Sequence, residues 1–302
     1  MTTDSVPVRR SVRLDYFELT KPRITFMVTL TCLVGFVMAS PGGIAPLPLL
    51  AAIAGTALVA AGSAVFNMLM EMRTDALMRR TRERPLPAGR LRPVQALAFG
   101  TLLTVAGLLT LAFGAGRLAA AVAFVTWCSY LLVYTPLKTR TSLATLVGAV
   151  PGALPPVIGW AAARNALEPG AFILFAILFL WQIPHFLAIA WIFQEDYERG
   201  GLPMLPVVDP AGRMTGRQAL ANTIALLVVS LAPTAAGLAG PLYALGAALL
   251  GTAYTIAAAR AAARRDLASA RRLFFVSILY LPILSALMIL DRTGGPLSGL
   301  AG

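Results

Sequence analysis

The sequence predicts an all-α membrane protein, a polytopic bundle of nine transmembrane helices with its N-terminus in the cytoplasm. Hydrophobic residues make up 58% of the 302 residues and charged residues only 13%, whereas soluble domains carry about 25% charged residues. Nine apolar segments approach the ~20 residues that cross a bilayer as a helix, and Lys and Arg alternate between their connections. This composition excludes a soluble enzyme, a disordered chain and a disulfide scaffold.

The apolar segments cover residues 24–40, 46–66, 93–114, 118–135, 142–163, 170–193, 218–238, 241–259 and 273–290. The first segment is short and follows basic residues, so a cleaved signal peptide is an alternative. Its apolar run exceeds the usual 7–15 residues of such peptides, which favours a helix. We therefore expect a basic cytoplasmic tail at 1–23, a membrane domain at 24–291 and a short C-terminal tail at 292–302.

The positive charges support this count of helices. Twenty-two of the 25 Lys and Arg residues fall in the N-terminal tail and in alternate connections, and three (Arg117, Arg164 and Arg292) fall in the others. The positive-inside rule predicts this alternation for nine spans with a cytoplasmic N-terminus. The formal net charge of +12 is therefore explained better by topology and anionic lipid headgroups than by nucleic-acid binding.

Acidic side chains gather in two cytoplasmic stretches. In the first, Asn67, Glu71, Asp75 and Arg79 recur every four residues, so on a continuous helix they form one polar stripe. Mg²⁺ prefers oxygen ligands of this kind together with phosphate oxygens. The alternative is a helix end in water whose carboxylates pair with nearby arginines.

The second acidic stretch lies four predicted helices later, on the same side of the membrane. It contains Glu195, Asp196, Glu198 and Asp209. This recurrence favours a binding site over two solvated helix ends. We therefore expect the two stretches to converge around a Mg²⁺-bound diphosphate below an apolar interior.

His185 is the sole histidine of the sequence. It follows Pro184, whose missing N–H leaves a backbone carbonyl without its helical partner. The histidine could bond to that interrupted backbone or to a neighbouring helix, or it could ligate haem iron.

Five stretches together resemble the intramembrane prenyltransferases of the UbiA type, and within them the branch of protoheme IX farnesyltransferases. They are 19–23 (LTKPR), 67–87 (NMLMEMRTDALMRRTRERPLP), 134–138 (YTPLK), 181–188 (WQIPHFLA) and 195–206 (EDYERGGLPMLP). Two positions depart from the pattern: Arg73 replaces an aspartate that many relatives carry, and Glu71 stands where Asp is frequent.

The resemblance implies transfer of a farnesyl group from farnesyl diphosphate to the 2-vinyl group of haem b, which is a substrate, with water added to give haem o. It implies Mg²⁺ as the cofactor. The implied catalytic and metal-binding residues are Asn67, Glu71, Asp75 and Asp196; the diphosphate-binding residues are Lys21, Arg23, Arg79, Arg84 and Lys138; the haem-binding residues are His185, Tyr134 and Tyr197.

The resemblance also implies a multi-pass protein of the cell inner membrane with its active-site loops in the cytoplasm, in contact with lipid. Haem a synthase or oxidase assembly proteins are candidate partners. Three other functions stay open at this stage. They are prenyl transfer to a quinone or another aromatic acceptor, secondary transport, and a non-enzymatic role in membrane assembly. Transporters usually carry ionisable residues near mid-membrane, and the predicted spans carry no Asp, Glu, Lys or Arg there.

Overall fold

The computed structural model describes residues 11–294. Residues 1–10 and 295–302 lie outside this part, and with them fall Arg9 and Arg10 of the expected basic tail and most of the expected C-terminal tail. Within the described residues the chain is helical, and its one β-bridge, between Ala239 and Arg292, is isolated. The expected all-α fold is confirmed.

The helices of the first half are α1 (Val12–Leu19), α2 (Pro22–Met38), α3 (Pro46–Met70), α4 (Met72–Leu77), α5 (Pro93–Gly114), α6 (Arg117–Cys128), the π-helix η1 (Ser129–Tyr134), α7 (Thr135–Leu137), α8 (Ala144–Ala153) and α9 (Pro155–Arg164). Those of the second half are α10 (Pro169–Ile192), α11 (Gln194–Arg199), α12 (Leu205–Val208), α13 (Arg213–Val229), α14 (Ala232–Ala235), α15 (Pro241–Arg264) and α16 (Leu267–Leu290).

Each of the nine predicted apolar segments forms helix. Within the described residues, eight spans are long and apolar enough to cross a membrane. The ninth is α2, which joins α1 at an angle of 43°. Part of the expected N-terminal tail is thus the helix α1, which the hydropathy pattern did not predict. Several long helices begin with a proline, including Pro46, Pro93 and Pro169, because proline fixes a helical φ and its missing N–H is not needed there.

Glycines allow neighbouring helices to approach closely. Gly55 of α3 and Gly107 of α5 face each other, and a Cβ added to either would lie within 3.0 Å of the other's carbonyl oxygen. Gly35 of α2 meets the backbone of Pro156 in α9, and Gly159 of α9 meets Cys32 in α2. Small residues at helix contacts let van der Waals packing stabilise a bundle within lipid.

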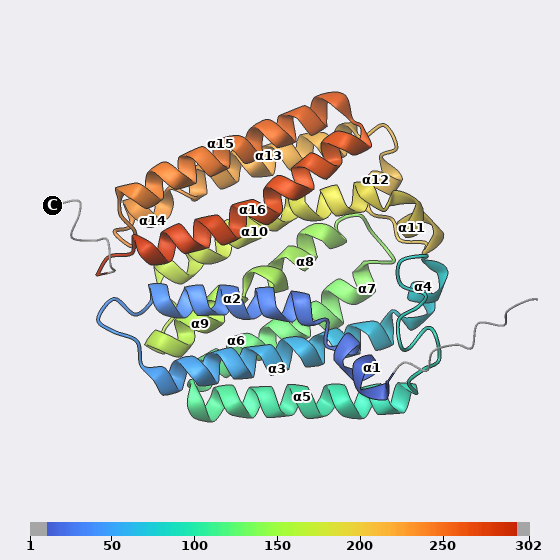
Figure 1. Ribbon diagram of the computed structural model, residues 1–302, viewed down its shortest axis with the longest axis horizontal. Helices are drawn as coiled ribbons and strands as arrows, with labels where there is room; N and C mark the ends of the chain where they lie inside the picture. Colours follow the sequence, from blue (N-terminus) through green and yellow to red (C-terminus); the bar gives the residue numbers. More distant parts are fainter. Residues whose placement is uncertain (1–10, 295–302) are drawn as a thin grey trace, which may run out of the picture.

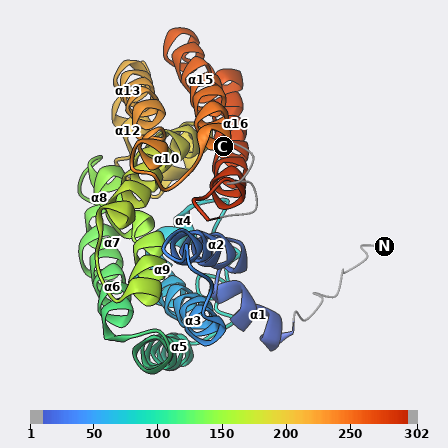
Figure 2. The ribbon, with the colours of Figure 1, turned by 90° about the vertical axis from the view of Figure 1, so that its left-hand side faces the viewer.

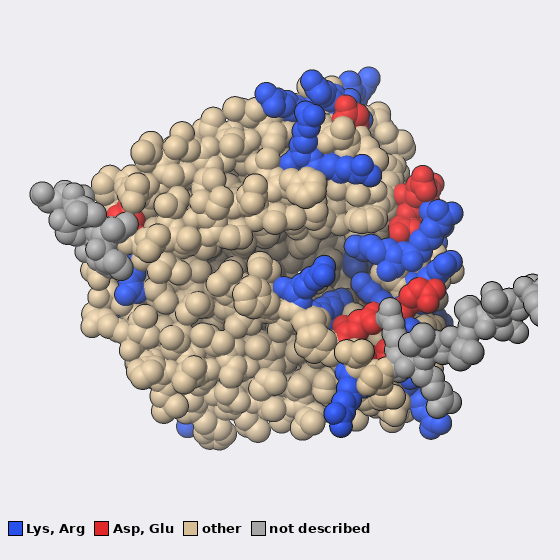
Figure 3. All heavy atoms as spheres, viewed as in Figure 1, with Lys and Arg blue, Asp and Glu red and all other residues tan. Residues whose placement is uncertain are grey.

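The spans are arranged in two groups, α2–α9 and α10–α16, as Figures 1 and 2 show. Helices α2 and α16, the first and last spans, face each other where the groups meet. They are tied at one end, where Arg292 donates to the Val37 carbonyl at 2.8 Å. The face drawn in Figure 3 is hollowed between the two groups.

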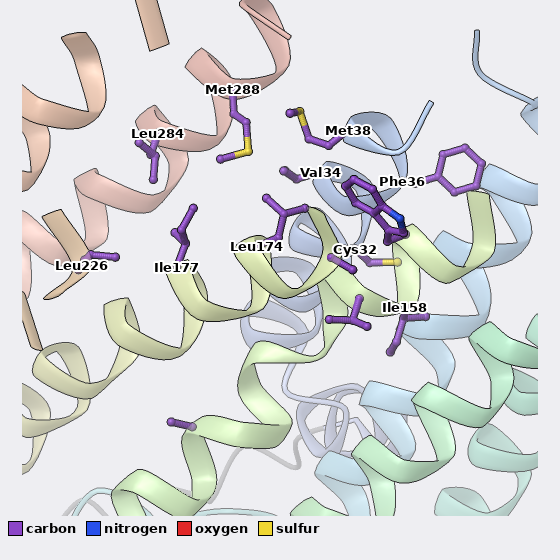
Figure 4. Close-up of a cluster of buried hydrophobic side chains, with 14 of the residues drawn as sticks. Cys32, Val34, Phe36, Met38, Ile158, Leu174, Ile177, Leu226, Leu284 and Met288 are labelled. Carbon is purple, nitrogen blue, oxygen red and sulfur yellow. The ribbon is translucent and has the colours of Figure 1, made fainter. Parts of the chain in front are cut away.

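The main apolar core runs along the bundle and includes the end where α2 and α16 are tied. Leu174 and Ile177 of α10 point toward Met288 of α16 and toward Val34 and Met38 of α2 (Figure 4). These side chains belong to one large buried cluster that joins both groups of helices. The two groups therefore fold around a shared core.

Most charged side chains seen in Figure 3 gather at the other end of the bundle. That end carries α4, α11, α12 and the loop 78–92 (Figure 1), and we call it the charged end. The other end carries few charges and we call it the opposite end. The acidic stretches singled out in the sequence both lie at the charged end.

Candidate active site

The polar stripe begins on α3 and continues on α4. The helix bends at Glu71, yet the i to i+4 pattern persists, since the Glu71 amide donates to Asn67 and the Asp75 amide donates to Glu71 at 2.9 and 2.8 Å. The stripe therefore holds Asn67, Glu71 and Asp75, as expected. The expectation that Arg79 extends it is wrong, because α4 ends at Leu77 and Met78 adopts an extended backbone.

Each oxygen-bearing residue of the stripe is paired with a cation from a different element. Lys21 Nζ donates to Asn67 Oδ1 at 2.7 Å, and Lys138 Nζ donates to Glu71 Oε1 at 2.9 Å. Arg84 donates to Asp75 Oδ2 at 2.7 Å. Three of the five expected diphosphate-binding residues thus converge on the three expected metal ligands of the stripe.

Lys21 reaches Asn67 from an unusual backbone conformation. It lies at the joint of α1 and α2 with φ 46° and ψ 61°, a left-handed conformation that costs a residue with a Cβ about 1–2 kcal/mol. Pro22 follows it and disfavours the right-handed alternative. Backbone strain of this kind concentrates at functional sites.

A π-helical turn places the next cation. The turn η1 interrupts the span 117–137, and the short helix α7 separates it from Lys138. Such turns occur frequently at functional sites. Thr135 follows it and accepts a hydrogen bond from the Asn67 side-chain amide at 3.3 Å. The Lys138 ammonium lies 5.7 Å from the Tyr134 ring centre. The turn thus sets both Thr135 and Lys138 against the polar stripe.

The electrostatics reflect buried charge pairs. Burial alone would raise the pKa of Glu71, but Lys138 and Lys21 outweigh it and the pKa is lowered. Burial opposes the charge of Lys138, yet Tyr134 and Glu71 raise its pKa above the ordinary lysine value. Burial, assisted by Arg84, lowers the pKa of Lys21 to about 8. The positive charges are close enough to oppose one another, and an anion placed between them would relieve that repulsion.

Asp75 is the least satisfied carboxylate of the site. It is only 1% exposed, and its Oδ1 is buried without a hydrogen-bond partner. Thr81 anchors its backbone by donating to the Asp75 carbonyl at 2.8 Å. A buried carboxylate oxygen without a partner is costly, and a hard cation would satisfy it. The donor set of Asn67, Glu71 and Asp75 therefore fits a magnesium ion.

Asp196 connects the second acidic stretch to the first. It lies on α11 and accepts hydrogen bonds from the backbone amides of Arg79 and Arg80 at 3.1 and 3.3 Å. Arg199 lies 3.4 Å from the same carboxylate. Asp196 therefore holds the loop that follows α4. Within the described residues it does not join Glu71 and Asp75 in a group of three metal-ligating side chains.

The other expected diphosphate-binding residues lie at the margin. The side chains of Arg23 and Arg79 are exposed, and neither makes an interaction with the described residues. Arg80, one of the arginines that follow the first acidic stretch, lies with its guanidinium carbon 4.9 Å from the Phe193 ring centre and donates to the Tyr197 hydroxyl at 3.4 Å.

The expected haem-binding residues fall into two places. Tyr134 and Tyr197 lie beside Lys138 and Arg80 respectively, next to the charged groups. His185 lies further inside the bundle on α10, where its Nδ1 is 2.7 Å from Ser277 Oγ of α16. No interaction links His185 to either tyrosine within residues 11–294. The histidine therefore bonds to a neighbouring helix and not to the backbone that Pro184 interrupts.

Comparison with solved structures shows the same fold. A structure described as digeranylgeranylglyceryl phosphate synthase aligns with a TM-score of 0.78 at 18% identity, covering 92% of this chain and 98% of that one. A UbiA homologue from Archaeoglobus fulgidus, bound to GPP and Mg²⁺, aligns with a TM-score of 0.66 at 16% identity over 91% of this chain and 99% of that one.

Comparison of sequences is more specific. The protoheme IX farnesyltransferase of Solibacter usitatus is 48% identical over 289 residues, which cover 93% of this chain and 99% of that protein. The enzyme of the same name from Anaeromyxobacter sp. is 44% identical over 91% of this chain and 93% of its own. The UbiA prenyltransferase family matches residues 28–279, and the chain belongs to that family.

Proposed function

We propose that this protein transfers the farnesyl group of farnesyl diphosphate to the 2-vinyl group of haem b, with addition of water, to give haem o. The observation that carries the proposal is the convergence of Lys21, Arg84 and Lys138 on three oxygen ligands at the mouth of an apolar bundle. The relatives named protoheme IX farnesyltransferase support the choice of substrates.

Asn67, Glu71 and Asp75 would hold Mg²⁺ together with the diphosphate. When bound, the ion supplies charge neutralisation to the leaving diphosphate. The protein offers two carboxylates and one amide here, and phosphate oxygens and water would supply the remaining ligands. Asp196 contributes as a positioning residue, because both of its oxygens accept from backbone amides of the arginine loop.

The three cations bind and orient the diphosphate. In the structure described here they pair with Asn67, Glu71 and Asp75, and an arriving diphosphate would share them. Arg and Lys donors aimed at developing negative charge are worth most where water is excluded. Exposed Arg23 and Arg79 are placed to attract the anion before it reaches the buried pairs.

The apolar interior protects the reaction from bulk water. The farnesyl chain is a hydrocarbon, and we assign it to the interior between the two groups of helices, beyond the cation cluster. An allylic cation released there meets the vinyl carbon of haem before it meets solvent. We assign haem to the same interior. His185 would contact it inside the bundle, and Tyr134 and Tyr197 would contact it toward the charged end.

The proposal includes the location of the site. The alternation of Lys and Arg supports a cytoplasmic position for the charged end. We propose that the protein lies in the cell inner membrane with its active-site loops on the cytoplasmic side. Haem a synthase or oxidase assembly proteins are proposed as partners that receive the product.

Mass analysis of the haem tests the reaction directly. Purified protein is incubated in detergent with haem b, farnesyl diphosphate and Mg²⁺, and the haem should gain the mass of a farnesyl group plus water. Omission of Mg²⁺ with a chelator present should abolish the gain. Unmodified haem, together with a mass gain on a quinone offered in parallel, would contradict the proposal and identify an aromatic acceptor instead.

A further inference from the structure

The hydrogen bonds around Ser277 determine which nitrogen of His185 carries a proton. Ser277 Oγ lies 2.5 Å from the Phe274 carbonyl oxygen and 2.7 Å from His185 Nδ1. A carbonyl oxygen can only accept, so the single hydroxyl proton of Ser277 is directed to Phe274. The hydroxyl must then accept from the histidine. His185 is therefore the tautomer with its proton on Nδ1.

This tautomer leaves the other ring nitrogen with a free lone pair. Nε2 of His185 has no hydrogen-bond partner in the described part of the chain, and it is not one of the buried side-chain atoms that lack one. It therefore reaches accessible space. A neutral imidazole with one nitrogen donating to a fixed acceptor and the other open is the arrangement that metal-ligating histidines adopt.

Aromatic side chains hold the imidazole in place. The ring stacks between Trp181 and Phe274, with centre-to-centre distances of 5.0 and 5.1 Å. Trp181 is itself fixed, because its indole N–H donates to the Ser277 carbonyl at 2.8 Å and Tyr254 donates to the Trp181 carbonyl at 3.1 Å. Ser277 thus anchors the histidine through its hydroxyl and the tryptophan through its backbone.

The face of α10 that carries His185 is the one directed at α2 and α16. Leu174, Ile177, Trp181 and His185 follow one another at intervals of three or four residues and so share a helix face. Figure 4 shows Leu174 and Ile177 on that face pointing toward side chains of α2 and α16. His185 lies two turns further along α10, toward the charged end and ~10 Å from the end of the helix at Ile192.

We propose that Ser277 is a positioning residue that fixes the His185 tautomer, so that Nε2 ligates the iron of the haem acceptor. The proposal rests on the proposed function, since haem is its substrate. The neutral nitrogen donates its lone pair and no proton is released. Ligation would hold the porphyrin at one depth and orientation beside the farnesyl chain.

The test compares two ligands that differ only in iron. Haem b and metal-free protoporphyrin IX are each titrated into the full-length protein in detergent, without farnesyl diphosphate. Wild type should bind haem b more tightly and give the absorption spectrum of a nitrogen-ligated iron. His185→Ala should lose this spectrum and bind both porphyrins equally, and unchanged protoporphyrin binding shows that the variant is folded.

Variants of Ser277 test whether its hydroxyl, which fixes the His185 tautomer, is needed for haem binding. Ser277→Ala should weaken haem b binding about 10- to 100-fold, the range for loss of a partner behind a metal ligand, and leave protoporphyrin IX binding within about threefold. Ser277→Thr retains the hydroxyl and should restore the preference for haem. Ser63→Ala is the matched control, because Ser63 also donates to a carbonyl of its own helix but contacts no histidine.

Two outcomes would overturn the inference. One is a wild-type spectrum and haem preference in His185→Ala. The other is an equal loss of both porphyrins in Ser277→Ala, which would indicate packing alone. Farnesyl transfer by the wild type is measured separately, so that a failure of the proposed function is distinguished from a failure of iron ligation.

Discussion

Both ends of the bundle bury a carboxylate, and the two carboxylates differ in their hydrogen-bond partners. At the opposite end Asp291, 4% exposed, accepts from the Tyr243 amide at 2.7 Å and so caps the first turn of α15. At the charged end Asp75, 1% exposed, pairs one oxygen with Arg84 and leaves the other without a partner. A carboxylate that caps a helix by accepting from its backbone stabilises the fold, whereas one with a buried oxygen that lacks a partner is prepared for a ligand.

The largest expected effect follows from removing the open oxygen. Asp75→Asn should lower kcat for haem farnesylation about 100-fold or more, the usual cost of losing one group that stabilises transition-state charge. The unfolding temperature should change little, since Arg84 can still donate to the amide oxygen. Activity assays and thermal unfolding in detergent check both parts. A kcat within threefold of wild type would contradict the role of Asp75 in the reaction.

Asp196 tests the intermediate case, a saturated carboxylate at the charged end. Asp196→Ala removes the acceptor for the amides of Arg79 and Arg80 and should lower kcat/KM about tenfold. Asp196→Asn keeps an acceptor oxygen and should recover part of the loss. If both variants retained wild-type kcat/KM, the loop would not need this carboxylate.

Asp291→Ala should have the opposite effect to Asp75→Asn, with lower stability and unchanged activity. Loss of the cap on α15 should destabilise the protein by about 1–2 kcal/mol, visible as a lower unfolding temperature. The kcat of the folded fraction should stay at the wild-type value. Reduced kcat without a change in unfolding temperature would contradict the assignment of the opposite end to stability.

The smallest effect is expected at Glu195, the neighbour of Asp196 in the sequence. Its side chain is 86% exposed and pairs with Arg199 at 3.1 Å across one helical turn. Such exposed pairs contribute less than about 1 kcal/mol. Glu195→Ala should therefore leave unfolding temperature and kcat/KM unchanged, which makes it the matched control for Asp196→Ala.

The sequence was sufficient for the spans and for the polar stripe. The bilayer itself determines the length of the apolar spans and the alternation of Lys and Arg. Both can therefore be predicted from the sequence without knowledge of tertiary contacts. The four-residue spacing of Asn67, Glu71 and Asp75 is local geometry and was predicted for the same reason. The end of α4 at Leu77 was not, because it depends on the loop that Asp196 holds from α11.

Long-range pairings account for what sequence reasoning missed. Ser277 meets His185 across 92 residues, and Lys21 meets Asn67 across 46. Nothing near Ser277 in the sequence marks it as a partner for a histidine, and α1, with eight residues, is too short to register in a hydropathy window. The left-handed backbone of Lys21 likewise depends on the angle between α1 and α2.

The π-helical turn at residues 129–134 makes the site sensitive to chain length. Each residue of an ordinary helix advances the chain by about 100°, and a π-turn accommodates one residue more than the regular repeat. Deleting a single residue from this stretch would keep the span apolar and long enough for the bilayer. It would also convert the π-turn into an ordinary helical turn and so change the placement of Lys138, whose ammonium donates to Glu71 at 2.9 Å.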